Sequence, residues 1–147
     1  MARTPDLERR QELLDRIVVY LADHGLAQAT LRPMARSLDV SINRLVHHFG
    51  TKEELLAAAH AACFAMALSG ALARNNTPAE RLDVSATVAF EKVEAGWRVT
   101  TSKLTLKGVV PSLDAARFAE IAEGAKSGCP ISSAISGNVA ISLEITT

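Results

Sequence analysis

The chain has few cysteines, few aromatic residues and no excess charge of either sign. Its 147 residues include two Cys, one Trp, one Tyr and four Phe, and sixteen basic side chains balance sixteen acidic ones. Two cysteines are too few for a secreted disulfide scaffold or for a zinc site made of cysteines alone. The zero net charge argues against a protein that is basic all over, although it is compatible with a local basic face.

The remaining composition is that of a globular protein. Apolar residues make up 48% and charged residues 22% of the chain, which excludes disorder. The first ten residues are polar and charged and contain no apolar signal core. We therefore expect a soluble cytosolic protein with one domain or two small ones.

Apolar residues recur every three or four positions through most of residues 7–76, which predicts a series of helices. The first three helices are expected to cover about 7–24, 31–38 and 42–48. The expected caps are Gly25, which would end the first helix in the left-handed conformation, and Thr30 and Ser41, which would begin the next two.

A longer helix follows. Thr51 and Glu54 have the spacing of a capping box, and the Ala-rich segment 55–73 behind them is nearly free of charge. Nineteen residues at ~1.5 Å each span roughly 28 Å, so a membrane helix is an alternative. His60, Ser69 and Gly70 interrupt the segment, and it lacks a basic flank or an aromatic belt, which favours a buried central helix.

After residue 81 the apolar period changes to two, which predicts strands. The strands are expected at about 82–90, from Trp97 to 106, and at 139–145, with a bulge near residues 101–102. A helix is expected to begin at Pro111 and to end between 124 and 128. The sequence therefore predicts an α+β fold: a three-helix head, a long buried helix, and an antiparallel sheet of about three strands with one further helix.

Two short helices joined by a three-residue corner have the helix-turn-helix arrangement. On the second of them Asn43, Arg44 and His47, with His48 beside them, are expected to face outward, where Arg pairs with guanine and Asn with adenine. Ser41 and Lys52 lie at helix starts, which suit phosphate. Arg32 and Arg36 add to a local basic excess of three between residues 32 and 52. The alternative interpretation is a helical hairpin with solvated arginines.

The segment 30–55, TLRPMARSLDVSINRLVHHFGTKEEL, resembles the DNA-binding head of TetR-family regulators. The similarity covers about residues 7–56. It implies that Arg32, Ser41, Asn43, Arg44, His47 and Lys52 contact DNA. Asp39 stands where the family often has Gly, and Val46 stands where it often has a Tyr that contacts phosphate.

The two cysteines lie 66 positions apart, Cys63 on the apolar helix and Cys129 just before Pro130. A cysteine on an apolar helix is often a small core residue. Alternatively, a helix N-terminus at Cys129 and a nearby cation at Cys63 would depress a thiol pKa. One thiolate can then attack a peroxide to give a sulfenic acid, and the other can resolve it as a disulfide.

The segments EELLAAAHAACFAMALS (53–69) and AKSGCPIS (125–132) resemble the OsmC branch of the OsmC/Ohr thiol peroxidases, as do VTTSKLTL (99–106) and VPSLDAARF (110–118). This resemblance runs from about Gly50 to the end. It implies that Cys63 is the peroxidatic thiol, Cys129 the resolving thiol and Glu53 the active-site carboxylate. His60 follows the OsmC variant, with a structural or a catalytic role. On a straight helix, however, Glu53 would lie ~15 Å from Cys63.

Family members begin with a β-hairpin region that carries an arginine, and here the regulator-like head takes its place. We therefore predict domains at 1–50 and 51–147, joined at a motif that both families share. The resemblances imply a homodimeric enzyme that reduces organic hydroperoxides with an external dithiol such as a lipoyl group, without a bound cofactor or metal. The alternatives are a DNA-binding regulator whose cysteines sense peroxide, and an inactive chimera.

Overall fold

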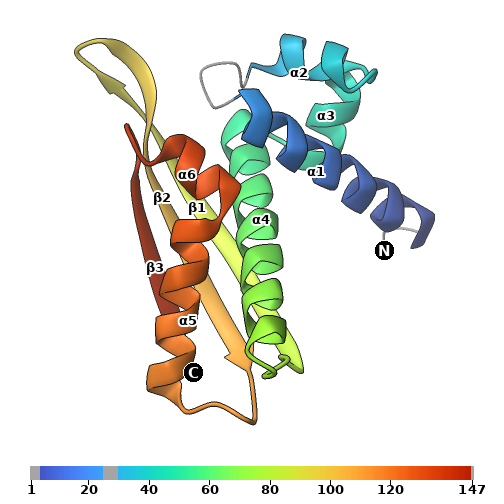
Figure 1. Cartoon of the computed structure of the whole chain (residues 1–147). Coiled ribbons are helices and arrows are strands. Elements are labelled where there is room, and N and C mark those ends of the chain that lie inside the picture. Colours follow the sequence, from blue (N-terminus) through green and yellow to red (C-terminus); the bar gives the residue numbers. More distant parts are fainter. Residues whose placement is uncertain (1–3, 25–29, 147) are drawn as a thin grey trace.

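The computed structural model describes residues 4–24 and 30–146, and Gly25, the expected cap of the first helix, lies outside these ranges. In chain order the elements are α1 (Thr4–His24), α2 (Leu31–Ser37), α3 (Ile42–Phe49), α4 (Lys52–Arg74), β1 (Arg81–Val93), β2 (Gly96–Val109), α5 (Ala115–Gly128), α6 (Pro130–Ile135) and β3 (Ala140–Thr146). The α+β fold class is confirmed. The first three helices form a head at one end of a body made of α4, the sheet, α5 and α6 (Figure 1).

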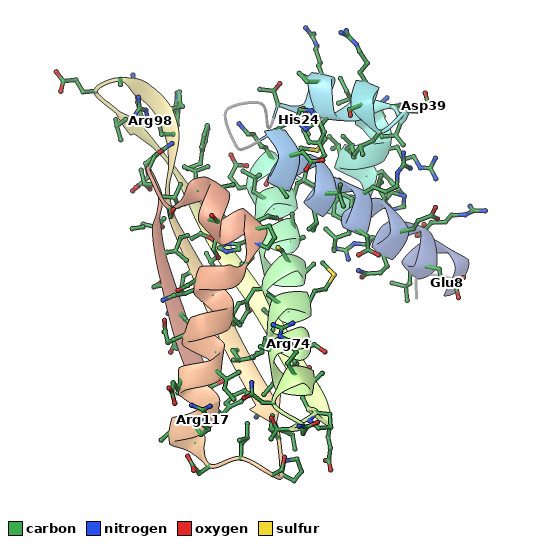
Figure 2. All side chains as sticks on the ribbon, viewed as in Figure 1. Glu8, His24, Asp39, Arg74, Arg98 and Arg117 are labelled. Carbon is green, nitrogen blue, oxygen red and sulfur yellow. The ribbon has the colours of Figure 1, made fainter. Side chains whose placement is uncertain are left out.

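The head is a helix-turn-helix unit in which α1 supports the two short helices. Ser41 caps α3 as predicted, with its hydroxyl accepting a hydrogen bond from the Arg44 amide at 3.2 Å, whereas Thr30 precedes α2 without a side-chain cap. At the corner between α2 and α3, Asp39 has a φ of +52°. This left-handed conformation favours glycine, and Asp is among the residues that tolerate it. Figure 2 labels Asp39 at this corner, at the outer edge of the head.

The central helix α4 begins at the predicted capping box. The Thr51 hydroxyl accepts from the Glu54 amide at 3.2 Å, and the Glu54 carboxylate accepts from the Thr51 amide at 2.7 Å. Within the described ranges α4 is the helix long and apolar enough to cross a membrane. It instead lies between the sheet, α1, α5 and α6, and its side chains Phe64, Leu68 and Leu72 have no exposed surface. The structure therefore supports the buried central helix.

The sheet has the order β1-β2-β3. A two-residue turn joins the antiparallel strands β1 and β2, and the register shifts where Ala89 pairs with Thr101 and Phe90 with Val99. Thr100 is the extra residue, so the bulge lies one position before the predicted one. Strand β3 pairs parallel with β2, which corrects the expected all-antiparallel sheet. The reason is the connection: α5 and α6 carry the chain back along the sheet, as parallel neighbours require.

Helices α4, α5 and α6 cover one face of this sheet (Figure 1). On the covered face Ser102, Leu104 and Leu106 of β2 are buried. Helix α5 begins at Ala115, capped by the Asp114 carboxylate, and not at Pro111, which lies in a turn before it. A short helix α6 adds to the single further helix that was expected. The middle of β2, the start of α6 and the middle of α4 meet beneath this cover, where His60 contacts Ser102 and Ser132.

Candidate active site

The two cysteines lie in contact at the centre of the body. Cys63 sits midway along α4, and Cys129 is the N-cap residue of α6, fixed by Pro130 at the first position of that helix. Their Sγ atoms are 3.0 Å apart and share a hydrogen bond, and both thiols are free. Cys63 is 3% exposed and Cys129 has no exposed surface. Folding thus creates a buried dithiol from residues 66 positions apart.

The contact between the two cysteines shifts their pKa values in opposite directions. The interaction with the Cys63 thiol lowers the pKa of Cys129 from its usual 9.0 to about 4; burial opposes this shift, and the nearby polar groups of His60 and Ser132 assist it. The same interaction with Cys129, together with burial, raises the pKa of Cys63 above 9.0. The two thiols therefore titrate as a coupled pair, in which the first proton is lost more easily than the second.

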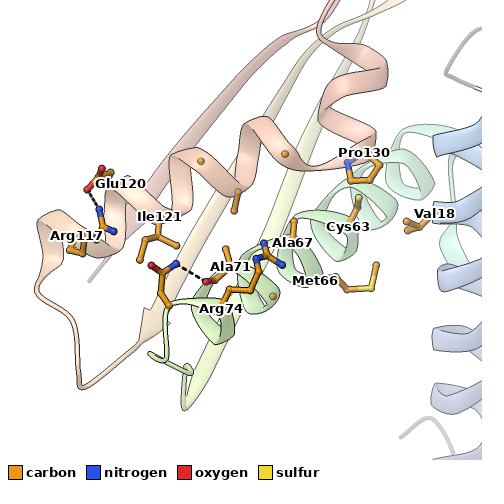
Figure 3. Close-up of a pocket in the computed structure, with 15 residues that line it drawn as sticks. Val18, Cys63, Met66, Ala67, Ala71, Arg74, Arg117, Glu120, Ile121 and Pro130 are labelled. Carbon is orange, nitrogen blue, oxygen red and sulfur yellow. Dashed lines mark hydrogen bonds and ion pairs between the residues drawn. The ribbon is translucent and has the colours of Figure 1, made fainter.

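A groove of about 670 Å³ leads from the surface to Cys63. Its lining residues come from four helices and the segments next to them: Val18 of α1; Cys63, Met66, Ala67, Gly70, Ala71 and Arg74 of α4, with Asn75; Arg117, Glu120, Ile121, Gly124, Ala125 and Gly128 of α5; and Pro130 of α6. Figure 3 shows Cys63 beneath Pro130, with Val18 approaching from α1. Cys129 is not part of this lining. Cys63 is therefore the thiol that a molecule in the groove would meet.

Beside the dithiol lies a buried polar chain. His60, one turn before Cys63 on α4, contacts the Ser102 hydroxyl through Nδ1 at 2.7 Å and the Ser132 hydroxyl through Nε2 at 2.9 Å. All three side chains are at least 96% buried. Ser102 belongs to β2 and Ser132 to α6, so the imidazole links three elements around Cys129.

Comparisons with known proteins assign the family. The model of the family "OsmC-like protein" matches residues 51–144, more than half of the chain. The chain belongs to the OsmC-like protein family. The model of "Bacterial regulatory proteins, tetR family" matches residues 13–59, as predicted for the head.

Individual relatives agree with this assignment. Peroxiredoxin OsmC of Escherichia coli (strain K12) is 39% identical over 93 residues, which are 63% of this chain and 65% of that protein, so the chain spans slightly less than two thirds of the length of this relative. The organic hydroperoxide resistance protein OhrB of Bacillus subtilis has a TM-score of 0.57 at 30% identity, covering 64% of this chain and 68% of that one. An organic hydroperoxide resistance protein from Elizabethkingia anophelis has a TM-score of 0.60 at 26% identity, covering 66% and 68%.

The structure does not bring Glu53, the carboxylate implied by this family, to the thiols. Glu53 lies in the first turn of the continuous helix α4, ten residues before Cys63. At ~1.5 Å per residue the two residues are about 15 Å apart along the axis. Among the described residues, Arg74 and Arg117 line the same groove as Cys63, and neither is among the groups that shift the pKa of Cys63 or Cys129.

Ser102, Ser132 and Val18 were not among the predicted site residues. Ser132 could have been found, because it is three residues after Cys129, in the first turn of the helix that Pro130 starts. Ser102 has a weaker signal: it is a polar residue at an inward position next to the bulge. Nothing in the sequence of α1 indicates that Val18 would reach the groove.

The residues predicted to contact DNA fall into two groups. Arg32, Ser41, Asn43, Arg44 and His47 are exposed on the head, as the helix-turn-helix interpretation requires. Lys52 is half-buried, and its Nζ lies 5.2 Å from the centre of the Phe90 ring, at the far end of β1. The contact of Lys52 with Phe90 is a cation–π interaction, which a phosphate would have to replace.

Within the described ranges, one group of side chains has possible metal ligands close together. Ligand atoms of Asp6, His47 and His48 lie within 4.8 Å of one another, where α1 and α3 meet. Ligand atoms around a tetrahedral zinc ion are about 3.4 Å apart, so this group is wider than a formed site.

Proposed function

We propose that this protein reduces organic hydroperoxides with Cys63 as the peroxidatic thiol and Cys129 as the resolving thiol. The observation that carries the proposal is the dithiol itself: two sulfur atoms 3.0 Å apart, of which Cys63 alone lines the groove. The similarity to Peroxiredoxin OsmC and to organic hydroperoxide resistance proteins supports the same chemistry.

The reaction has two steps at the dithiol. The Cys63 thiolate attacks the outer oxygen of the hydroperoxide, the O–O bond breaks, and the alkoxide leaves and takes a proton to form the alcohol. The sulfur of Cys129 then attacks the Cys63 sulfenic acid, which forms the disulfide and releases hydroxide. An external dithiol reduces this disulfide with two electrons and two protons, as a lipoyl group would, and no bound cofactor is needed.

The groove suits an organic substrate. The wall near Cys63 is apolar, with Met66, Ala67 and Pro130 among the lining side chains, and Ile121 and Arg117 lie farther along α5 (Figure 3). An apolar wall stabilises the alkyl part of a hydroperoxide by removing it from water. We therefore place the hydroperoxide oxygens at Cys63 and the organic group along α4 and α5.

Turnover of cumene hydroperoxide with dihydrolipoamide tests the proposal. We expect Cys63→Ser to abolish turnover, Cys129→Ser to permit one equivalent of peroxide to be reduced, and Ser133→Ala, an exposed hydroxyl on α6, to leave turnover unchanged. Mass spectrometry of peroxide-treated protein should find a peptide that joins Cys63 to Cys129. No turnover and no crosslinked peptide would instead indicate an inactive chimera.

We propose a cytosolic homodimer. The cytosol keeps thiols reduced, which this catalytic cycle requires. On the helix-covered face of the sheet, side chains of the outer strands are only half-buried, among them Leu82 and Val84 of β1 and Ile141 and Leu143 of β3. A second copy would cover such apolar surface. Light scattering at micromolar concentration would contradict the dimer if it gave the mass of one chain.

A second function, peroxide-dependent binding of DNA, is favoured by one observation. Val18 of α1 lines the groove beside Cys63, and α1 also packs against α4 and α6. A change at the dithiol therefore occurs next to the helix that supports α2 and α3. Comparing the DNA affinity of the reduced and the peroxide-oxidised protein tests this function, and equal affinities would oppose it.

A further inference from the structure

One wall of the groove beside Cys63 does not come from the OsmC-like body. Val18 of α1 lines the groove together with Cys63 and Pro130, and among the described residues of the head it is the one that does so. Figure 3 shows Val18 close to Cys63, with Met66 and Pro130 near the same thiol. The opening onto the Cys63 sulfur is therefore shared between the body and the regulator-like head.

Packing holds Val18 in this place. The apolar stripe of α1 is at most 6% exposed at four positions of helical spacing: Leu14, Ile17, Val18 and Leu21. Through this stripe α1 packs on α4, which carries Cys63, and on α6. A valine in a helix has one strongly preferred χ1 rotamer, so its two methyl groups stay in one arrangement. Val18 is therefore a fixed part of the wall.

The groove is narrow at the thiol and wider beyond it. Cys63 is 3% exposed although it lines a groove of about 670 Å³, whereas Met66, three residues farther along α4, is 52% exposed. Attack on a hydroperoxide needs the sulfur and the outer oxygen to approach to about 3–3.5 Å. This approach brings the carbon that bears the peroxide next to the side chains around the thiol. Bulk on that carbon is what Val18 would meet.

We propose that Val18 is a specificity-determining residue of the peroxidase groove, and that its methyl groups limit the branching of the carbon attached to the peroxide. The proposal rests on the proposed function for its substrate. It favours hydroperoxides whose first carbon is unbranched, with the rest of the chain in the wider part of the groove, over tertiary hydroperoxides. It also gives the regulator-like head a role in choosing the substrate, because α1 supplies this side chain.

Alkylation tests access to the thiol without any peroxide. In a Cys129→Ser background Cys63 is the sole thiol of the chain, and iodoacetamide and iodoacetanilide share a reactive group but differ in bulk. The ratio of their rates cancels the fraction of Cys63 that is ionised. We expect Val18→Ala to lower the preference for the smaller reagent about tenfold and Val18→Ile to raise it about tenfold, as a carbon or two can do in a packed pocket. The matched control Val19→Ala, at a position 61% exposed, should leave the ratio unchanged.

Turnover of two isomers tests the same wall with both cysteines present. n-Butyl and tert-butyl hydroperoxide differ only in branching, and the ratio of their kcat/KM values should fall about tenfold in Val18→Ala and rise in Val18→Ile. A loss of stability alone would lower both values and leave their ratio unchanged. An unchanged ratio of either kind in both variants, with folding checked by circular dichroism, would overturn the proposal. A shifted alkylation ratio in a protein that reduces neither hydroperoxide would support the place of Val18 at the thiol and refute the proposed function.

Discussion

Replacing Ile17 by Ala tests whether the regulator-like head and the OsmC-like body fold as one unit. Ile17 has no exposed surface, and it belongs to a hydrophobic core that is continuous from α1 through α4 to α5, α6 and the sheet. The substitution removes three carbons at ~0.8 kcal/mol each, about 2.4 kcal/mol of transfer free energy. The cavity left behind raises the loss of unfolding free energy to about 3–4 kcal/mol.

The assay can observe the body while the head is changed. Trp97 is the single tryptophan, lies on β2 and stacks on Phe90 at 5.7 Å between ring centres, so its fluorescence reports on the body. With a urea dependence of about 1.5 kcal/mol per molar, Ile17→Ala should lower the fluorescence midpoint by about 2 M. The matched control is Val19→Ala, two residues along α1 and 61% exposed, which should leave the midpoint nearly unchanged.

One result would refute this reasoning. If circular dichroism shows loss of helix at low urea while the Trp97 midpoint stays at its original value, the head unfolds alone and the shared core does not couple the two parts. A single transition at lower urea, seen by both measurements, is the expected outcome for one cooperative unit.

Three further predictions follow from the site and the head. Glu53→Gln should change the rate of peroxide-driven Cys63 oxidation by less than about threefold, because Glu53 is ~15 Å away along α4; a loss of more than tenfold in stopped-flow would show that the helix start unwinds. The unfolding free energy should rise with pH from about 4 towards 9, because the pKa of Cys129 is lowered from 9.0 to about 4 in the folded protein. The stability that this thiolate contributes is lost as the pH falls through about 4. Urea midpoints that show the same pH dependence in Cys129→Ser would contradict this prediction. DNA binding should be weak and salt-sensitive, because sequence-specific binding needs two heads spaced about 34 Å apart, and an OsmC-like dimer has no reason to set that spacing. Lys52→Ala should reduce the salt dependence of the affinity by the equivalent of about one phosphate contact. A palindrome selected from random DNA and bound in the nanomolar range at physiological salt would oppose this prediction.

Access to the groove separates the two cysteines. Cys63 lines the groove and Cys129 does not. Access therefore favours Cys63 for the attack on peroxide, and the 3.0 Å distance between the sulfur atoms lets Cys129 follow as the resolving thiol.

Local patterns in the sequence determined the helices and most of the strands. The capping box of Thr51 and Glu54, the Ser41 cap and the change from a period of three to four to a period of two are effects of neighbouring residues, so they can be predicted without knowing the packing. The two cysteine motifs likewise carry the family resemblance in short segments.

Tertiary structure alone decided what these segments do together. The direction of β3 depends on how α5 and α6 return the chain, and the contacts of His60 with Ser102 and Ser132 join residues 42 and 72 positions apart. The position of Glu53 depends on α4 remaining one helix from Lys52. Periodicity and capping involve residues within about one or two helical turns, whereas a buried hydrogen bond between distant segments exists only after the core has brought them together.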